Sequence, residues 1–259
     1  EVSGIIVDKG AHAEGWEIGD AVIAYPGAKM GGHAEYITMP AKGSMVKKPA
    51  QLSFAEATAI PFGGCTALDF LCNKAKLQAG ERVLVVGASG ATGSAAVQLA
   101  HHFGAKVTGV CSAKNAELVL GLGAQKVIDY TREDFAASMD RFDMIVDTTG
   151  TAPWKRVKHL LTPKGRLVII SGTTGDMLRS VFSRRIVGGV AGESADLLQR
   201  LLSIMNEGGF FPLIDRIYPF EHIVNAHTHV DTGRKKGTVV VSMVPEISAS
   251  DQKSDARYG

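Results

Sequence analysis

Short apolar runs alternate with amphipathic stretches through the middle of the chain. The runs are rich in valine and isoleucine and cover 82–87, 106–110, 126–129, 142–150 and 165–171. Runs of this length with β-branched residues indicate buried strands, and stretches with helical character lie between most of them. Strands that alternate with helices predict right-handed βαβ units, so we expect an α/β protein with a parallel, doubly wound sheet.

Further elements are predicted toward the C-terminus. RIVGGV (185–190) fits a sixth strand, and SADLLQRLLSIMNEG (194–208) has the spacing of a long amphipathic helix. The pattern leaves this rhythm after residue 211, and KKGTVVVSM (235–243) predicts one more strand. The polar segment 245–259 predicts a disordered tail.

The N-terminal part has a different pattern, with short strands between Gly, Pro and Asp residues. Strands are predicted over 2–7, at the end of 15–24 and over 34–39, which indicates a small β-rich unit. The next segment, 53–74, predicts helical pieces broken by Pro61, Gly63 and Gly64. At its start, the S-x-x-E sequence of Ser53 and Glu56 predicts a capping box, so a helix is expected to begin there.

Composition excludes several classes of protein. The 259 residues include 28 Lys plus Arg against 26 Asp plus Glu, a net charge of +2. Nucleic-acid-binding proteins usually show a strong basic excess, so a nucleic-acid partner is not expected. The 45% of apolar residues is typical of a globular protein and not of a disordered acidic chain.

Cysteine usage and hydropathy bear on the cellular compartment. The three cysteines contain no C-x-x-C pair, so we expect no disulfide framework and a reduced, cytoplasmic location. The longest stretch without charge, Val83 to Ala105, is too polar and glycine-rich for a membrane span. No signal peptide is visible, and the start at Glu1 in place of Met indicates a fragment or a processed chain.

The sequence GASGATG (87–93) lies between a predicted strand and a predicted helix. Gly87 would end the strand, Gly90 would let the backbone approach a pyrophosphate, and Gly93 would let the helix pack on the sheet. Backbone N–H groups at the helix start would then hold the phosphates. The alternative is a glycine-rich turn that binds nothing.

The end of the second strand bears on the choice of dinucleotide. Sites that prefer NADH usually place an acid there, to bind the ribose 2′-hydroxyl. Here the residues run from Cys111 to Asn115, and the first acid is Glu117 in the next helix. Because Ser112 and Lys114 suit a 2′-phosphate, we expect NADPH. The alternative is that Lys114 is a solvated charge at a helix start.

With these motifs, the chain resembles the zinc-independent quinone oxidoreductase (zeta-crystallin-like) branch of the medium-chain dehydrogenase/reductase superfamily. The matching segments follow the family's order over most of the chain: GWEIGDAVIA (15–24), GGHAEYITMP (31–40), LSFAEATAIPFGGCTALDFL (52–71), LQAGERVLVVGASGATGSAAVQLA (77–100), LGAQKVIDYTREDF (122–135) and HVDTGRKKGTVVV (229–241). The resemblance implies a Rossmann domain over 76–211. It also implies a discontinuous, incomplete GroES-like β-rich domain formed by 1–75 and 212–244.

The resemblance also implies the residues that contact the cofactor. Around the pyrophosphate these are Ser89, Gly90, Ala91 and Thr92, followed by Gly93. Ser112 and Lys114 would face the 2′-phosphate, and Tyr130 would lie beside the adenosine ribose. The remaining expected contacts are Thr66 near the nicotinamide, Thr149 and Gly150 beside the adenosine or its ribose, and Lys236 and Gly237 over the cofactor.

A zinc site is not expected. Relatives with a structural zinc carry four closely spaced cysteines, which this chain lacks. Where a catalytic zinc ligand would stand, four residues before Thr66, this chain has Phe62, and Cys65 is out of register. The histidines expected at caps or on the surface are His222, His227 and His229, and those expected on the solvent side of the helix after the glycine loop are His101 and His102.

The implied activity is hydride transfer from NADPH to a small molecule, a quinone or an α,β-unsaturated carbonyl, without a metal. Tyr36 and His33 are candidate cleft residues, and no proton donor can be named. The family segment that precedes the match to Glu1 is absent from this sequence. The alternatives are therefore an NADP-dependent alcohol dehydrogenase-like enzyme and a cofactor-binding protein without turnover. The resemblance further implies a homodimer that pairs through 185–190, and no membrane partner.

Overall fold

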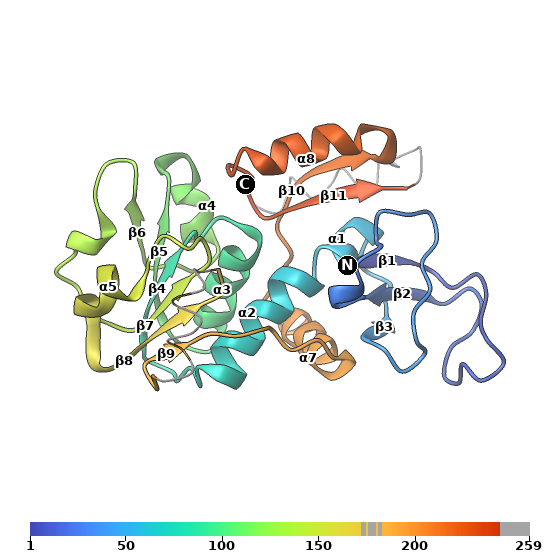
Figure 1. The fold of residues 1–259 in the computed structure, drawn as a ribbon, viewed down its shortest axis with the longest axis horizontal. Coiled ribbons are helices and arrows are strands. Elements are labelled where there is room, and N and C mark those ends of the chain that lie inside the picture. The colour runs from blue at the N-terminus through green and yellow to red at the C-terminus, as the bar shows by residue number, and fades with distance from the viewer. Residues whose placement is uncertain (172–174, 176–179, 181–182, 244–259) are drawn as a thin grey trace.

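A parallel sheet forms the centre of the larger body of the protein (Figure 1). The computed structural model describes residues 1–171, 175, 180 and 183–243. Within these residues the sheet has six strands in the order β6-β5-β4-β7-β8-β9, and every neighbouring pair is parallel. The expected doubly wound fold is confirmed. The strands are β4 (Arg82–Val86), β5 (Lys106–Cys111), β6 (Lys126–Asp129), β7 (Phe142–Asp147), β8 (Leu161–Ile169) and β9 (Ile186–Val187).

Apolar side chains are buried on both faces of this sheet. Alternate residues of β4 enter two separate clusters, with Val83 and Val85 in one and Leu84 and Val86 in the other. Burial on both faces explains why the strand is a continuous apolar run. The helices and short helical turns between these strands are α3 (Ala91–His102), η4 (Ala113–Asn115), α4 (Ala116–Gly121), η5 (Phe135–Ala137), α5 (Trp154–Val157) and η6 (Lys158–Leu160).

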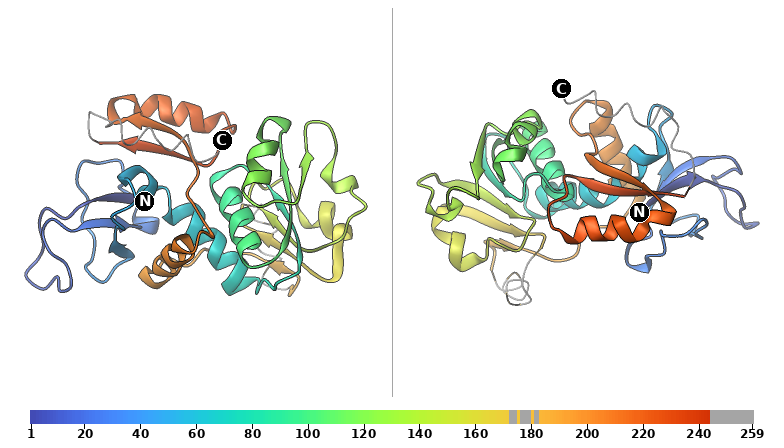
Figure 2. Two further views of the ribbon diagram at one scale, coloured as in Figure 1. Left: turned by 180° about the vertical axis from the view of Figure 1, so that it is seen from behind. Right: turned by 90° about the horizontal axis from the view of Figure 1, so that it is seen from above.

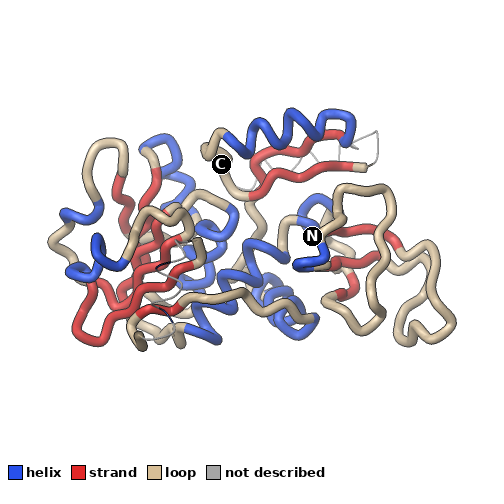
Figure 3. Tube along the Cα trace, in the orientation of Figure 1, coloured by secondary structure: helices blue, strands red, loops and turns tan. Residues whose placement is uncertain are grey.

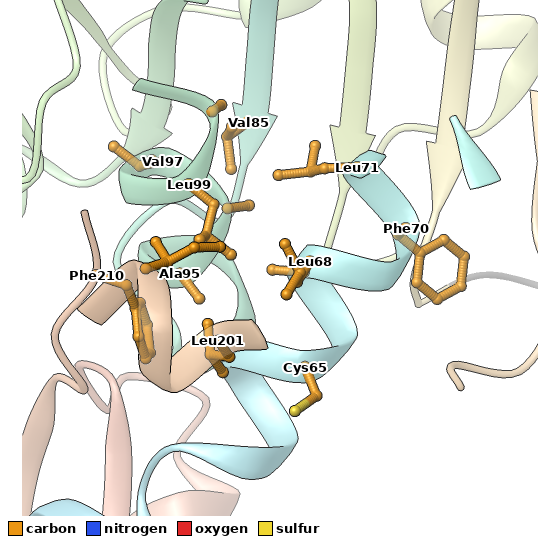
Figure 4. Packing of buried hydrophobic residues seen from close by; sticks show 14 of the residues in the cluster. Cys65, Leu68, Phe70, Leu71, Val85, Ala95, Val97, Leu99, Leu201 and Phe210 are labelled. Carbon is orange, nitrogen blue, oxygen red and sulfur yellow. The ribbon is translucent and has the colours of Figure 1, made fainter. Parts of the chain in front are cut away.

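A helical layer lies between the central sheet and the N-terminal strands (Figure 2). It contains α7 (Ala195–Asn206), which Ser194 caps by accepting a hydrogen bond from the Leu197 N–H. Leu201 of α7 packs in one cluster with Leu68, Leu99 and Phe210 (Figure 4). The other helical pieces of the layer are α1 (Phe54–Thr58), η2 (Pro61–Cys65), α2 (Thr66–Leu68) and η3 (Asp69–Lys74).

The prediction that glycines break this helical segment is wrong. The capping box of Ser53 and Glu56 is confirmed, and Pro61 stands at the first position of η2. Gly63 and Gly64, however, lie inside the helical run. A Cβ on Gly64 would come within 2.4 Å of Leu201 Cδ2, so this glycine permits close packing where a chain break was expected.

Asp69 is a buried acid whose side chain connects η3 to the loop before α7. Its side chain accepts hydrogen bonds from Lys74 Nζ, from Asn73 Nδ2 at 2.9 Å and from the Gly192 N–H at 2.8 Å. Burial raises the pKa of this carboxyl, but the bonds from Lys74, Gly192 and Asn73 outweigh it and hold the pKa below its usual value. The loop before α7 is thereby fixed to η3.

The N-terminal segment forms a small antiparallel sheet with long loops (Figure 3). Its strands are β1 (Val2–Ile5), β2 (Ala21–Ala24) and β3 (Met45–Lys47), and η1 (Gly27–Lys29) is a short turn. The strand predicted over 34–39 is wrong. That segment is a largely exposed loop, because its alternating pattern finds no neighbouring strand with which to form a ladder.

The C-terminal part adds elements that the sequence pattern does not predict. β10 (Ile214–Pro219) pairs in parallel with β11 (Thr238–Ser242), and η7 (Phe220–His222) and α8 (Ile223–Asp231) connect them. In Figure 1 this unit lies above α1 and the N-terminal strands. The predicted terminal strand is confirmed as β11. The tail over 245–259, for which disorder is predicted, lies outside the described residues.

Candidate functional site

The glycine loop joins β4 to α3 through an unusually close turn. Gly87 has a φ of +84°, a conformation that favours glycine. A Cβ on Gly93 would lie 2.0 Å from the Gly87 carbonyl oxygen. Gly90 is the N-cap of α3 and provides no side-chain hydrogen bond to the first turn. No side chain of the N-cap residue therefore occupies the backbone N–H groups of the first turn. These groups remain available to bind an anion.

Two distant segments hold this loop in place. Asn115 Nδ2 donates to Ser89 Oγ at 2.9 Å, and the Gly237 N–H donates to the Ser89 carbonyl at 2.8 Å. Gly237 also forms an isolated bridge with Gly90. Lys235 Nζ in turn donates to the Gly237 carbonyl at 2.5 Å, while Lys236 is exposed. Gly237 thus lies against the loop, at the place where the sequence predicts a cofactor contact.

The turn after β5 lies beside this loop. Ser112 precedes η4 and is half-buried, and Lys114 is exposed. Tyr130 follows β6, is 59% exposed, and donates its backbone N–H to the Cys111 carbonyl at 3.2 Å. The structure therefore brings the three residues predicted around the adenosine end to neighbouring strand ends.

Asp129 is an acid at this corner that the sequence interpretation missed. It ends β6 and pairs with Cys111 in the ladder. Its Oδ1 accepts from the Thr131 hydroxyl at 2.8 Å and from the Thr131 N–H at 3.0 Å. These bonds hold the pKa of Asp129 below its usual value, and the nearby Ala113 N–H adds to the effect. Oδ2 has no hydrogen-bond partner of ordinary geometry within the described residues. Only the strand pairing reveals this acid, since it is distant from Ser112 in sequence.

Thr149 and Gly150 follow β7 and lie on the other side of the loop. A Cβ on Gly87 would meet Thr149 Cγ2 at 2.4 Å, so the two segments are in close contact. The buried Asp147 accepts from the N–H groups of Thr149 at 3.0 Å and Gly150 at 2.9 Å. The ends of β4 and β7 meet here, where the strand order reverses, and doubly wound proteins bind their ligands at this point.

Thr66 reaches the site through its helix. Gly63, three residues earlier, packs so closely on α3 that a Cβ there would lie 2.9 Å from the Ala91 carbonyl. Thr66 itself is 5% exposed. The helical segment that carries it therefore abuts the first turn of α3.

Glu1 is a half-buried acid that sequence reasoning did not identify. Its Oε2 accepts from the Phe62 N–H at 2.6 Å, one turn before Thr66. Burial raises the pKa of Glu1, against lowering by the Phe62 bond and by the positive charge of Lys235. A carboxyl group thus lies next to the segment that carries Thr66.

The cysteines and histidines do not form a cluster suited to a metal within the described residues. Burial raises the pKa of Cys65 to about 12, so this thiol stays protonated at neutral pH. The prediction of a cap histidine is confirmed for His222, which is the N-cap of α8. His229 is half-buried and bonds Asp215 Oδ2 at 2.5 Å, whereas the ring of His227 packs edge-on against that of His33, with centroids 5.3 Å apart.

The structure confirms the predicted surface position of His101 but not that of His102. His101 is exposed as expected, but His102 is partly buried against the end of α7, with its Nε2 3.6 Å from Glu207 Oε2. His33 and Tyr36 lie in the exposed 31–40 loop, and Tyr36 is 74% exposed.

None of the helices in the described ranges is both long and apolar enough to cross a membrane.

Comparison with known proteins gives consistent matches. Residues 122–241 match a family model described as zinc-binding dehydrogenase. The chain is 35% identical over 257 residues to 2-methylene-furan-3-one reductase of Solanum lycopersicum, covering 95% of this chain and 63% of that protein. It is 30% identical over 277 residues to the mitochondrial NAD(P)H oxidoreductase RTN4IP1 of Mus musculus, covering 94% of this chain and 69% of that protein. The chain thus spans slightly less than two thirds of the tomato relative's length.

Solved structures show the same fold. The quinone oxidoreductase of Coxiella burnetii superposes with a TM-score of 0.80 at 27% identity. The match covers 93% of this chain and 78% of that one. Both the central sheet and most of the flanking parts therefore have counterparts in a known structure.

Proposed function

We propose a function for this chain from its family, since it belongs to the quinone oxidoreductase-like branch of the medium-chain dehydrogenase/reductase superfamily. The proposed activity is the NADPH-dependent reduction of quinones or α,β-unsaturated carbonyl compounds without zinc. The observation that carries the proposal is the glycine loop at the carboxyl end of β4. The 2.0 Å approach between a Cβ on Gly93 and the Gly87 oxygen explains why only glycine fits there. A backbone cradle of this kind suits a dinucleotide pyrophosphate.

The loop residues fit this ligand in chemical terms. The backbone N–H groups of Ala91, Thr92 and Gly93 lie at the positive end of the α3 dipole, which favours a pyrophosphate. The Ser89 hydroxyl can add a hydrogen bond, and Ala91 and Thr92 are small enough to leave the approach open. Gly237 would cover the loop from the other side, with Lys236 exposed beside it to attract the phosphates.

The choice of NADPH depends on the turn after β5. Lys114 forms no ion pair among the described residues, so its charge is available for a 2′-phosphate, with the Ser112 hydroxyl next to it. Tyr130 presents an exposed ring for the adenosine end. Asp129 argues for NADH, but its Oδ1 is occupied by two bonds from Thr131 and its Oδ2 is buried, which supports a structural role for this acid.

A bound nicotinamide dinucleotide would supply the hydride. Thr66 would lie near the nicotinamide, and Thr149 and Gly150 would flank the adenosine or its ribose, because their segments border the glycine loop at the strand-order reversal. A conjugated acceptor needs positioning more than a metal, since the reacting carbon is already activated. The tomato relative's name, with its methylene group beside a ring ketone, supports this substrate class.

Operation without zinc is supported by the chemistry of the available donors. Protein zinc sites gather three or four Cys, His or carboxylate ligands around one point. No group of three suitable ligands exists among the described residues. The three free thiols also support a reducing compartment, such as the cytoplasm.

Homodimerisation through 185–190 is part of the proposal. β9 is the last strand of the sheet order, so it can pair with a second copy across a two-fold axis. Val190, just beyond it, is 84% exposed. Light scattering of the purified chain should give twice the monomer mass, and a monomer at high concentration would contradict this pairing.

The decisive experiment is a fluorescence titration of the chain with NADPH and with NADH, followed by turnover assays. Tight NADPH binding and consumption of NADPH with a quinone or an enone, unchanged after EDTA treatment, would support the proposal. Turnover with a simple alcohol or aldehyde would favour the alcohol dehydrogenase alternative. Binding without turnover would favour a non-catalytic role, and failure to bind either dinucleotide would reject the proposal.

A further inference from the structure

Asn115 is a buried polar residue whose hydrogen bonding is incomplete. Its side chain lies under the turn after β5, with only 5% of the residue exposed. The amide Nδ2 donates to Ser89 Oγ at 2.9 Å, whereas Oδ1 has no partner within the described residues. The structure has the amide nitrogen as the donor, and rotating the amide by 180° would leave both of its N–H donors without a partner.

Packing alone does not account for this amide. A buried carbonyl oxygen without a donor destabilises the folded protein, and an apolar side chain of similar size would avoid that cost. The bond to Ser89 is therefore the contact for which an amide is needed at this position.

The same bond decides what the Ser89 hydroxyl can do. A hydroxyl has one proton to donate and two lone pairs that accept. Since the Asn115 amide donates to Oγ, the proton of Ser89 must point elsewhere, and no other residue of the described chain bonds it. The backbone of Ser89 is held separately, because its carbonyl accepts the Gly237 N–H at 2.8 Å. Ser89 is thus fixed on two sides with an unused donor on the glycine loop.

We propose that Asn115 is a positioning residue that turns the Ser89 hydroxyl proton toward the dinucleotide pyrophosphate. This inference rests on the proposed dinucleotide binding. Asn115 itself touches no phosphate, since its unpartnered oxygen is buried. It acts by holding Oγ as an acceptor, so that the hydroxyl donates outward to an anion without having to reorient.

A double-mutant cycle in cofactor binding tests this arrangement. The affinities of NADPH and NADH are measured by fluorescence for the wild type, Asn115→Ala, Ser89→Ala and the double variant. Each single variant should bind about tenfold more weakly, the range expected for a hydrogen bond to a charged group. The double variant should match Ser89→Ala, because Asn115 acts only through that hydroxyl. Both dinucleotides should lose the same factor, since both carry the pyrophosphate.

Asn115→Asp tests the direction of the bond. A carboxylate can only accept from Ser89, so it would take the hydroxyl proton away from the ligand and weaken binding at least as much as alanine does. Wild-type affinity in this variant would overturn the proposal. Asn225→Ala, at an exposed position of α8, is the matched control and should bind normally.

Each outcome separates this inference from the proposed function. Thermal unfolding midpoints of all variants confirm that they are folded. If the wild type binds the dinucleotides but the two substitutions add independently, or only NADPH is affected, the positioning role is wrong and the proposed function stands. If the folded wild type binds neither dinucleotide, both are wrong.

Discussion

Gly93 lies directly against the carbonyl group of Gly87, so closely that a Cβ on Gly93 would be 2.0 Å from that oxygen. The contact joins the first turn of α3 to the end of β4 through backbone atoms alone. Because neither partner is a flexible side chain, relief requires movement of the loop itself.

Gly93→Ala should therefore destabilise the protein and disrupt the loop. We expect a loss of about 1–3 kcal/mol in the free energy of unfolding, the usual cost of overpacking, and at least tenfold weaker NADPH binding. Urea unfolding and fluorescence titration measure the two effects. Gly121→Ala is the control, because a Cβ there meets nothing within 4 Å. It should leave binding unchanged. If Gly93→Ala bound NADPH as tightly as the wild type, the glycine loop would not be the pyrophosphate site.

Lys114→Ala should weaken NADPH binding selectively. Loss of a charge-assisted bond to a 2′-phosphate predicts about tenfold weaker binding of NADPH, with NADH changed less than about twofold. Isothermal calorimetry with both dinucleotides tests this difference. Lys155→Ala removes a surface charge near α5 and should affect neither. If the affinities for NADPH and NADH fell by the same factor, Lys114 would attract both dinucleotides by its charge and would not bind the 2′-phosphate.

Asp69→Asn should destabilise the helical layer at neutral pH. The change leaves Lys74 without its buried counter-ion and weakens the bond to the Gly192 N–H, so we expect a loss of about 3 kcal/mol. The folded pKa of Asp69 is depressed, so its stabilisation is present above the unfolded pKa of about 3.9 and disappears as the pH falls through the lower folded pKa. Urea midpoints should accordingly differ between wild type and variant at pH 7, and the difference should shrink as the pH falls below about 4. A constant difference would contradict the ion-pair explanation.

The buried thiols should make the protein less stable in alkali. Burial raises the pKa of the Cys65 thiol to about 12 in the folded protein, whereas in the unfolded chain this pKa stays near its ordinary value of 9.0. The unfolded chain therefore loses this proton first, and stability falls as the pH rises from about 9 toward 12. Cys65→Ala should show a shallower decline of the urea midpoint between pH 8 and pH 10.5. Alkylation at pH 8 offers a second check, since Cys65 and Cys111 should react only after unfolding.

The central sheet could be predicted from sequence because local pattern and burial agree there. β6 covers Lys126–Asp129, the same residues as the predicted strand, because its apolar residues are contiguous and its ends are polar. The 34–39 segment has equally good alternation but no partner strand, and a single-strand pattern carries no information about pairing. The missed β10 has no fully buried residue, and α8 has Ala226 as its buried residue, so neither gives a strong burial pattern.

The candidate site divides in the same way. The glycine loop is local in sequence and was predictable, whereas Asn115, Asp129 and Glu1 become relevant only through contacts between distant segments. Asn115 looks like an ordinary helix-start residue until its bond to Ser89 is seen. Asp129 reaches the corner through strand pairing, and Glu1 through the backbone of Phe62. These groups required the tertiary structure.

The bond from the Gly237 N–H to the Ser89 carbonyl has a consequence for synthesis of the chain. The six strands of the central sheet all precede residue 190, so they can assemble while the C-terminal strand is still inside the ribosome. At that stage the glycine loop lacks its hydrogen-bond partner Gly237, which directly precedes β11. A nascent chain would thus acquire the fold of its sheet first and a finished nucleotide loop only after residue 237 has left the ribosome.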